Sequence, residues 1–180
     1  MSLKGKKVIF VIANQGFQPI EYSVPKQMLE AKGIQVITAS NKPGGAVATD
    51  NSTTPVDITL DQINIAECNG IFFIGGSGAM DALDHDTSYK LINEARKQKK
   101  PFGAICIATR ILAKAGALVG VKVTGWDDDM ALETILKTNG AIYEKHPIVT
   151  DGLVVTAAGP KSAKEFGEGI IRVLTKKELE

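Results

Sequence analysis

The sequence predicts a doubly wound α/β fold, in which helices flank a mostly parallel sheet. A continuous apolar run over residues 7–13 lacks the period-two alternation of a half-exposed strand, which is typical of a strand buried on both faces. Further short apolar runs alternate with stretches of helical periodicity. The length of 180 residues suits one core, so we expect a single domain over residues 1–180.

The remaining elements follow in strand and helix order. We expect further strands at residues 35–39, 70–74, 102–105, 122–124, 148–150 and 153–156. We expect helices at residues 19–31, 89–99, 107–115 and 130–136, and a last helix after Gly159-Pro160. Asp151-Gly152 favours a two-residue hairpin turn between the last two strands. The stretch 41–59, rich in glycine, threonine and proline, predicts short extended pieces.

Composition narrows the class of partner. With 21 Lys+Arg against 20 Asp+Glu, the net charge of +1 provides no basic surface for nucleic acid or anionic lipid. Apolar runs fall far short of the roughly 20 residues that span a bilayer, and the start lacks a signal-peptide pattern, so we expect a cytoplasmic protein. Only two cysteines occur, and we expect both to be free thiols.

Cys106 follows a predicted strand and precedes a predicted helix, at the edge where open α/β sheets bind ligands. Ala104 and Ala108, two residues before and two after, match the small flanking residues of a nucleophile elbow. A thiol at a helix N-terminus is expected to have a lowered pKa. A buried, unreactive Cys106 is an equal alternative on these residues alone. Cys68 precedes its strand and is expected to be structural.

Two other features reach the same edge. Glu21, in the first turn of the first helix, could exchange a proton with Cys106 or a substrate, or simply favour the helix dipole. The turn Gly75-Gly76-Ser77-Gly78 lacks the spacing of a nucleotide-binding loop. Its N–H groups, with that of Ile107, could form an oxyanion hole, although a tight strand-to-helix turn is the simpler explanation.

Together these residues resemble the ThiJ/PfpI superfamily, whose flavodoxin-like fold is shared with class I glutamine amidotransferase domains. The resemblance covers nearly the whole chain and rests on residues 7–13, Glu21-x-x-x-Pro25, Ile74-Gly75-Gly76, Ala104-Ile105-Cys106, and Asp151-Gly152-Leu153 leading to Gly159-Pro160. It implies a nucleophile at Cys106, a glutamate at Glu21 hydrogen-bonded to it, and an oxyanion or substrate site at Gly75, Gly76 and Ile107. It also implies a homodimer or larger assembly.

Three departures from the family bear on the chemistry. Ile107 stands where protease-like members carry a histidine, and Trp126 stands where the parkinsonism-associated deglycase carries one. Ala158 replaces an arginine before Gly-Pro. Trp126 is expected to wall the pocket or to pack in the core. Of the two histidines, His146 is expected in a surface loop and His85 in solvent.

The run Asp127-Asp128-Asp129 predicts a helix N-cap rather than a metal site, and we expect neither a metal nor a cofactor. Whether His146 or one of these aspartates is a third catalytic residue stays open.

The first functional hypothesis is an enzyme of the glyoxalase or deglycase type, in which Cys106 adds to a small reactive carbonyl and Glu21 moves the proton. This chemistry needs no histidine. The alternatives are a redox-sensing stress protein or chaperone with an oxidisable Cys106, and a PfpI-like cysteine peptidase whose site is completed by oligomerisation.

Overall fold

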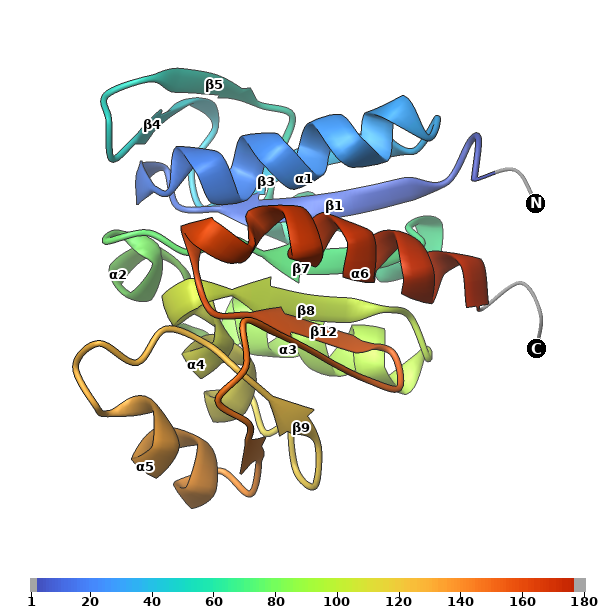
Figure 1. The fold of residues 1–180 in the computed structure, drawn as a ribbon. Helices are drawn as coiled ribbons and strands as arrows, with labels where there is room; N and C mark the ends of the chain where they lie inside the picture. The colour runs from blue at the N-terminus through green and yellow to red at the C-terminus, as the bar shows by residue number, and fades with distance from the viewer. Residues whose placement is uncertain (1–2, 177–180) are drawn as a thin grey trace.

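The computed structural model describes residues 3–176, so residues 1–2 and 177–180 of the expected domain lie outside the described residues. The strands of the main sheet are β1 (Lys7–Ile12), β3 (Gln35–Ser40), β6 (Ile58–Thr59), β7 (Gly70–Phe73), β8 (Phe102–Ile105), β11 (Ile148–Asp151) and β12 (Val154–Ala157). Their order is β11-β12-β8-β7-β1-β3-β6, and only the β11/β12 hairpin is antiparallel (Figure 1). The predicted fold class is therefore confirmed.

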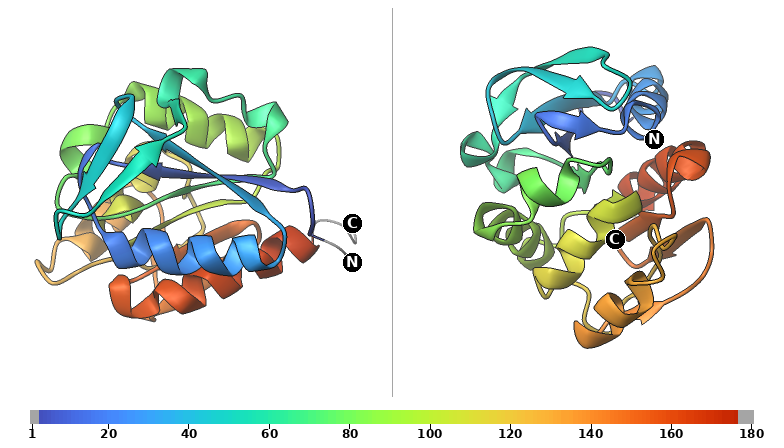
Figure 2. Two further views of the ribbon diagram at one scale, coloured as in Figure 1. Left: turned by 90° about the horizontal axis from the view of Figure 1, so that it is seen from above. Right: turned by 90° about the vertical axis from the view of Figure 1, so that its left-hand side faces the viewer.

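Helices cover both faces of this sheet. They are α1 (Pro19–Ala31), α2 (Ala79–Leu83), α3 (Asp86–Lys97), α4 (Thr109–Lys114), α5 (Leu132–Thr138) and α6 (Ala163–Lys176). Helices α1 and α6 lie side by side on one face, and α3 and α4 cover the other (Figure 2). Within the described residues, no helix combines the length and the apolar character that a membrane span requires.

Short strands and single 3-10 turns complete the chain. One small sheet joins β2 (Gln15–Phe17), β4 (Gly44–Ala48) and β5 (Thr53–Val56), of which β4 and β5 are short extended pieces as expected within residues 41–59. Another joins β9 (Lys122–Val123) and β10 (Ile142–Tyr143). The 3-10 turns are Leu60–Gln62, Ile65–Glu67, Cys106–Ala108 and Pro160–Ser162.

Strand β1 explains why its sequence shows no alternation. Ile9 and Val11 belong to the hydrophobic layer beneath α3 and α4, whereas Phe10 and Ile12 belong to the layer beneath α1 and α6. All four side chains are buried. A strand with apolar layers on both sides has no face for polar residues, as in other parallel sheets.

Several boundaries differ from the predicted ones. The helix expected from residue 107 begins at Thr109, because a 3-10 turn first carries the chain away from Cys106. The helix expected from Met130 begins at Leu132, since Met130 has a left-handed φ of 57°. In the hairpin, Asp151 pairs with Val154, so residues 152–153 form the turn, one residue later than expected.

Phe72 tests the layer beneath α1 and α6. Its ring is fully buried and meets Phe10 and Phe166 edge to face, with centroids 6.4 and 6.0 Å away. We expect Phe72→Ala to lower the free energy of unfolding by about 3–5 kcal/mol in urea denaturation, because it removes this packing and leaves a cavity. Ile20→Ala, at a half-exposed side chain, should change it by less than about 0.5 kcal/mol. Equal losses would contradict this packing.

Candidate active site

Cys106 occupies the corner between β8 and α4. Its backbone has a φ of 65°, in the left-handed region that a non-glycine residue enters at a cost of about 1–3 kcal/mol. Ala104 and Ala108 are fully buried on either side. The elbow predicted from these small residues is therefore present, and the side chain of Cys106 is only 9% exposed.

Glu21 reaches Cys106 from the first turn of α1. The side chain of Gln18 caps this helix by accepting hydrogen bonds from Ile20 N at 2.6 Å and Glu21 N at 3.4 Å. The Glu21 carboxyl group is fully buried, accepts a hydrogen bond from Gly75 N at 2.9 Å through Oε2, and is hydrogen-bonded with the Cys106 thiol. Its Oε1 atom is buried with no hydrogen-bond partner among residues 3–176.

The turn at Gly75 and Gly76 requires glycine for space. A Cβ atom at Gly75 would lie 2.6 Å from both Cys106 Cβ and Glu21 Oε2. At Gly76, φ is +121° and a Cβ atom would lie 2.3 Å from the carbonyl oxygen of Gly16. This absence of side chains lets the backbone N–H of Gly76, together with that of Ile107, donate a hydrogen bond to Cys106.

Burial dominates the electrostatics of the pair. It raises the pKa of Glu21 to about 7, against the hydrogen bonds from Cys106 and Gly75. Burial and the neighbouring Glu21 carboxylate raise the pKa of Cys106 to about 12, against the Ile107 and Gly76 N–H groups. The lowered thiol pKa expected from the helix N-terminus alone is therefore wrong. Near neutral pH the pair is a thiol beside a carboxyl group close to its own pKa, whose ionised form can take the thiol proton.

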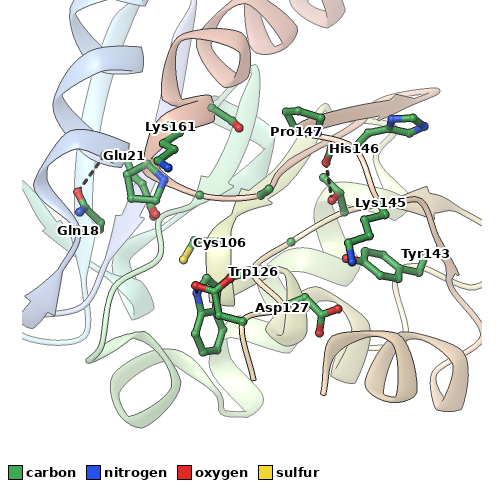
Figure 3. Close-up of a pocket in the computed structure, with 17 residues that line it drawn as sticks. Gln18, Glu21, Cys106, Trp126, Asp127, Tyr143, Lys145, His146, Pro147 and Lys161 are labelled. Carbon is green, nitrogen blue, oxygen red and sulfur yellow. Dashed lines mark hydrogen bonds between the residues drawn. The ribbon is translucent and has the colours of Figure 1, made fainter. Parts of the chain in front are cut away.

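A pocket of about 840 Å³ opens above this pair (Figure 3). Its walls come from three loops and the start of α1, which bring together residues that lie far apart in the sequence. The lining residues are Gln18, Glu21, Cys106, Thr124, Gly125, Trp126, Asp127, Asp128, Tyr143, Lys145, His146, Pro147, Ala158, Gly159, Pro160, Lys161 and Ser162. Of the predicted site residues, Glu21, Cys106 and Trp126 line the pocket, whereas Gly75, Gly76 and Ile107 lie behind the thiol as backbone partners.

Arg110 fixes the wall that carries Trp126. Its guanidinium binds both oxygens of Asp129, at 2.6 and 3.0 Å, and lies 5.2 Å from the centre of the Trp126 ring. Trp126 N also donates to the Cys106 carbonyl oxygen at 3.2 Å, so the loop is tied to the elbow itself. Sequence analysis missed Arg110, since an arginine in a predicted helix carries no local sign of its partners.

The remaining candidates have mostly structural roles. The helix N-cap predicted at Asp127-Asp128-Asp129 is wrong in position, because Ala131 is the N-cap residue of α5. Asp127 Oδ1 accepts a hydrogen bond from Leu132 N, the first residue of the helix, at 2.8 Å, and Asp128 Oδ2 accepts one from Trp126 Nε1 at 3.1 Å. His146 is exposed on the far side of the pocket from Cys106 (Figure 3).

Two residues lie outside the pocket. His85, expected in solvent, is half-buried with its ring Nε2 3.1 Å from the Ala82 carbonyl oxygen. Cys68 is a buried free thiol that donates to the carbonyl oxygen of Ile65. Among residues 3–176, no three His, Cys, Asp or Glu side chains are grouped to hold a metal ion.

The sequence of this chain is similar to those of known proteins. The model described as the DJ-1/PfpI family matches residues 6–173. An uncharacterized protein of Methanocaldococcus jannaschii is 33% identical, over 97% of this chain and 85% of the relative. A deglycase of Pyrococcus horikoshii is 26% identical, over 93% of this chain and 99% of the relative. Other relatives include a deglycase named PfpI from Pyrococcus furiosus and a general stress protein of Bacillus subtilis.

Solved structures agree in fold. A ThiJ/PfpI domain protein from Brachyspira murdochii superposes with a TM-score of 0.90 at 26% identity, covering 96% of this chain and 98% of the other. Drosophila melanogaster DJ-1beta gives a TM-score of 0.80 at 22% identity, covering 96% and 97%, which shows the shared fold.

The raised pKa of Cys106 predicts that alkylation of its thiol requires high pH. We measure the rate of alkylation by iodoacetamide against pH in a Cys68→Ser background, so that Cys106 is the only thiol. The midpoint of this profile should lie well above ~8.5, the pH at which an ordinary thiol titrates. Glu21→Gln should shift that profile to lower pH, because it removes the carboxylate that opposes the thiolate. A wild-type midpoint at or below ~8.5 would contradict this prediction.

The raised pKa of Glu21 predicts a pH-dependent stability. The protonated acid stabilises the fold fully below its ordinary pKa of 4.5, and this contribution is lost as pH rises through about 7. Glu21→Gln stays neutral, so between pH 4 and pH 8 its stability relative to wild type should rise by up to about 3 kcal/mol, at 1.36 kcal/mol per pH unit. Urea denaturation at the two pH values measures this difference in stability. A difference that does not change with pH would show that the pKa of Glu21 is not raised.

Proposed function

Because this chain belongs to the DJ-1/PfpI family, as the sequence resemblance predicted, we propose that it is a cysteine-dependent enzyme acting on small reactive carbonyl compounds. The observation that carries the proposal is the fully buried Glu21 carboxyl group hydrogen-bonded with the Cys106 thiol at the base of a pocket. Burying a carboxylate next to a thiol costs stability, and groups whose pKa values are raised in this way cluster at functional sites. Two relatives with deglycase names, one of them 26% identical, are consistent with carbonyl chemistry.

Methylglyoxal illustrates the first step. The Cys106 sulfur forms a bond to the aldehyde carbon while the thiol proton passes to the Glu21 carboxylate. The carbonyl oxygen becomes an oxyanion, which the N–H groups of Gly76 and Ile107 stabilise until Glu21 returns the proton to it and is a carboxylate again. The product is a hemithioacetal. No separate thiolate has to exist beforehand, so a high resting thiol pKa is compatible with attack.

The second stage moves a proton and adds water. Glu21 takes the hydrogen on the former aldehyde carbon as a proton and returns it to the neighbouring ketone carbon, through an enediol, to give a lactoyl thioester. Water then cleaves the thioester, which releases lactate and restores the thiol. One methylglyoxal and one water are consumed for each lactate and proton released, so the reaction needs no oxidant.

The two alternatives fit these contacts less well. Oxidation by peroxides depends on thiolate character and exposure, whereas Cys106 is 9% exposed and its pKa is raised. Peptide hydrolysis requires protonation of a leaving amine, which a Cys-His pair normally supplies. The histidine that lines this pocket, His146, lies across it from Cys106.

Conversion of methylglyoxal to lactate tests the proposal. Wild type should form lactate, Cys106→Ser should form none above background, and Glu21→Gln should lower kcat/KM by at least about 100-fold, the usual contribution of a general base. Cys68→Ser is the matched control and should retain the wild-type rate, because Cys68 lies outside the pocket. The proposal fails if lactate formation is absent or independent of Cys106.

A further inference from the structure

The acidic side chains that line the pocket have hydrogen-bond partners within the chain, whereas the lysines that line it have none among the described residues. Each acidic side chain in the lining has a partner within the chain: Glu21 binds Gly75 N, Asp127 binds Leu132 N, and Asp128 binds Trp126 Nε1. The two lysines of the lining, Lys145 and Lys161, make no ion pair or hydrogen bond within residues 3–176. The two ammonium groups are therefore available to pair with a ligand, whereas the lining carboxyl groups already accept hydrogen bonds within the chain.

These lysines stand on different sides of the reactive thiol. Figure 3 shows Lys161 on the same side of Cys106 as Glu21, and Lys145 across the pocket beside Tyr143. Lys161 belongs to the 3-10 turn Pro160–Ser162, which leads directly into the 14-residue helix α6. The N–H groups at the start of such a helix favour anions, which adds to the charge of Lys161.

The size of the pocket favours a substrate larger than methylglyoxal. Its volume of about 840 Å³ is in the range of roughly 300–1,000 Å³ that holds drug-sized ligands. A molecule as small as methylglyoxal leaves most of this space empty. The ring of Trp126, held by Arg110, and the ring of Tyr143 add apolar wall to the pocket.

We propose that the natural substrate carries an anionic group, a carboxylate or a phosphate, which Lys161 or Lys145 binds while its carbonyl carbon lies at Cys106. This inference rests on the proposed function for the identity of the reacting group, but the anion site itself rests on the unpaired lysines. It selects anionic oxoaldehydes over neutral ones of the same length. The lysine that binds the anion contributes a charge-assisted hydrogen bond that weakens with ionic strength.

Trp126, the only tryptophan in the chain, reports occupancy without turnover. In Cys106→Ser protein, succinate and glycerol 3-phosphate are titrated against Trp126 fluorescence, with succinamide and glycerol as neutral counterparts. We expect one or both anions to bind at least about 10-fold more tightly than their counterparts, and to lose about 10-fold in affinity in the Lys145→Gln/Lys161→Gln double variant, in line with one charge-assisted hydrogen bond. Which anion binds more tightly distinguishes a carboxylate from a phosphate.

Lys90→Gln is the matched control, because this exposed lysine on α3 lies outside the pocket, and it should bind both anions as the parent does. Circular dichroism and thermal melts establish that each variant is folded. Equal binding of anions and neutral counterparts, or unchanged affinity in the folded double variant, would overturn the proposal.

Turnover separates this inference from the proposed function. The wild-type protein should process 4,5-dioxovalerate, an oxoaldehyde with a carboxylate, with a kcat/KM at least about 10-fold above that of its neutral methyl ester, and the double variant should lose this preference. Anion binding without any Cys106-dependent turnover would leave the anion site standing and reject the carbonyl chemistry. Turnover with no preference for the anionic compound would reject the anion site alone.

Discussion

The contact between the Glu21 carboxyl group and the Cys106 thiol is the constraint to which the surrounding structure is fitted. Both groups are withdrawn from water, which raises the pKa of each. Such a pair needs donors other than water, and the backbone supplies them from Gly75, Gly76 and Ile107. The two glycines have no room for a Cβ atom, and the Cys106 backbone is held in the left-handed region. The site is therefore maintained against strain by the rest of the fold.

The two hydrophobic layers provide the stability that this strain requires. Glu21 enters from α1, the glycine turn from the end of β7, and Cys106 from the end of β8. These three segments meet because β1, β7 and β8 are parallel neighbours, so the connections after them emerge at one edge of the sheet. Movement of any one strand would separate the carboxyl group from the thiol.

Above the pair, the pocket is built by loops whose positions depend on a second set of polar contacts. Arg110 joins the first turn after the elbow to Asp129 and Trp126, and Trp126 in turn hydrogen-bonds to the elbow. The wall and the thiol are thus linked directly, which is the kind of preorganisation that catalysis by positioning needs. Lys145 and Lys161, which make no ion pair among residues 3–176, line other walls of the same pocket.

Sequence patterns alone determined the fold class, the position of Cys106 at a strand-to-helix corner and the position of Glu21 in the first helical turn. Hydrophobic runs, small residues and helix-start residues are local signals, so they can be recognised without knowing which residues they contact in the fold. Only the tertiary structure decided the electrostatic state of the thiol, the Arg110 contacts and the charge of the pocket walls. Desolvation depends on everything that surrounds a group, and Lys145 and Lys161 approach one pocket only after the sheet has formed. A helix N-terminus predicted a low pKa for Cys106, but burial and a facing carboxylate, neither visible in its neighbourhood in the chain, reverse that direction.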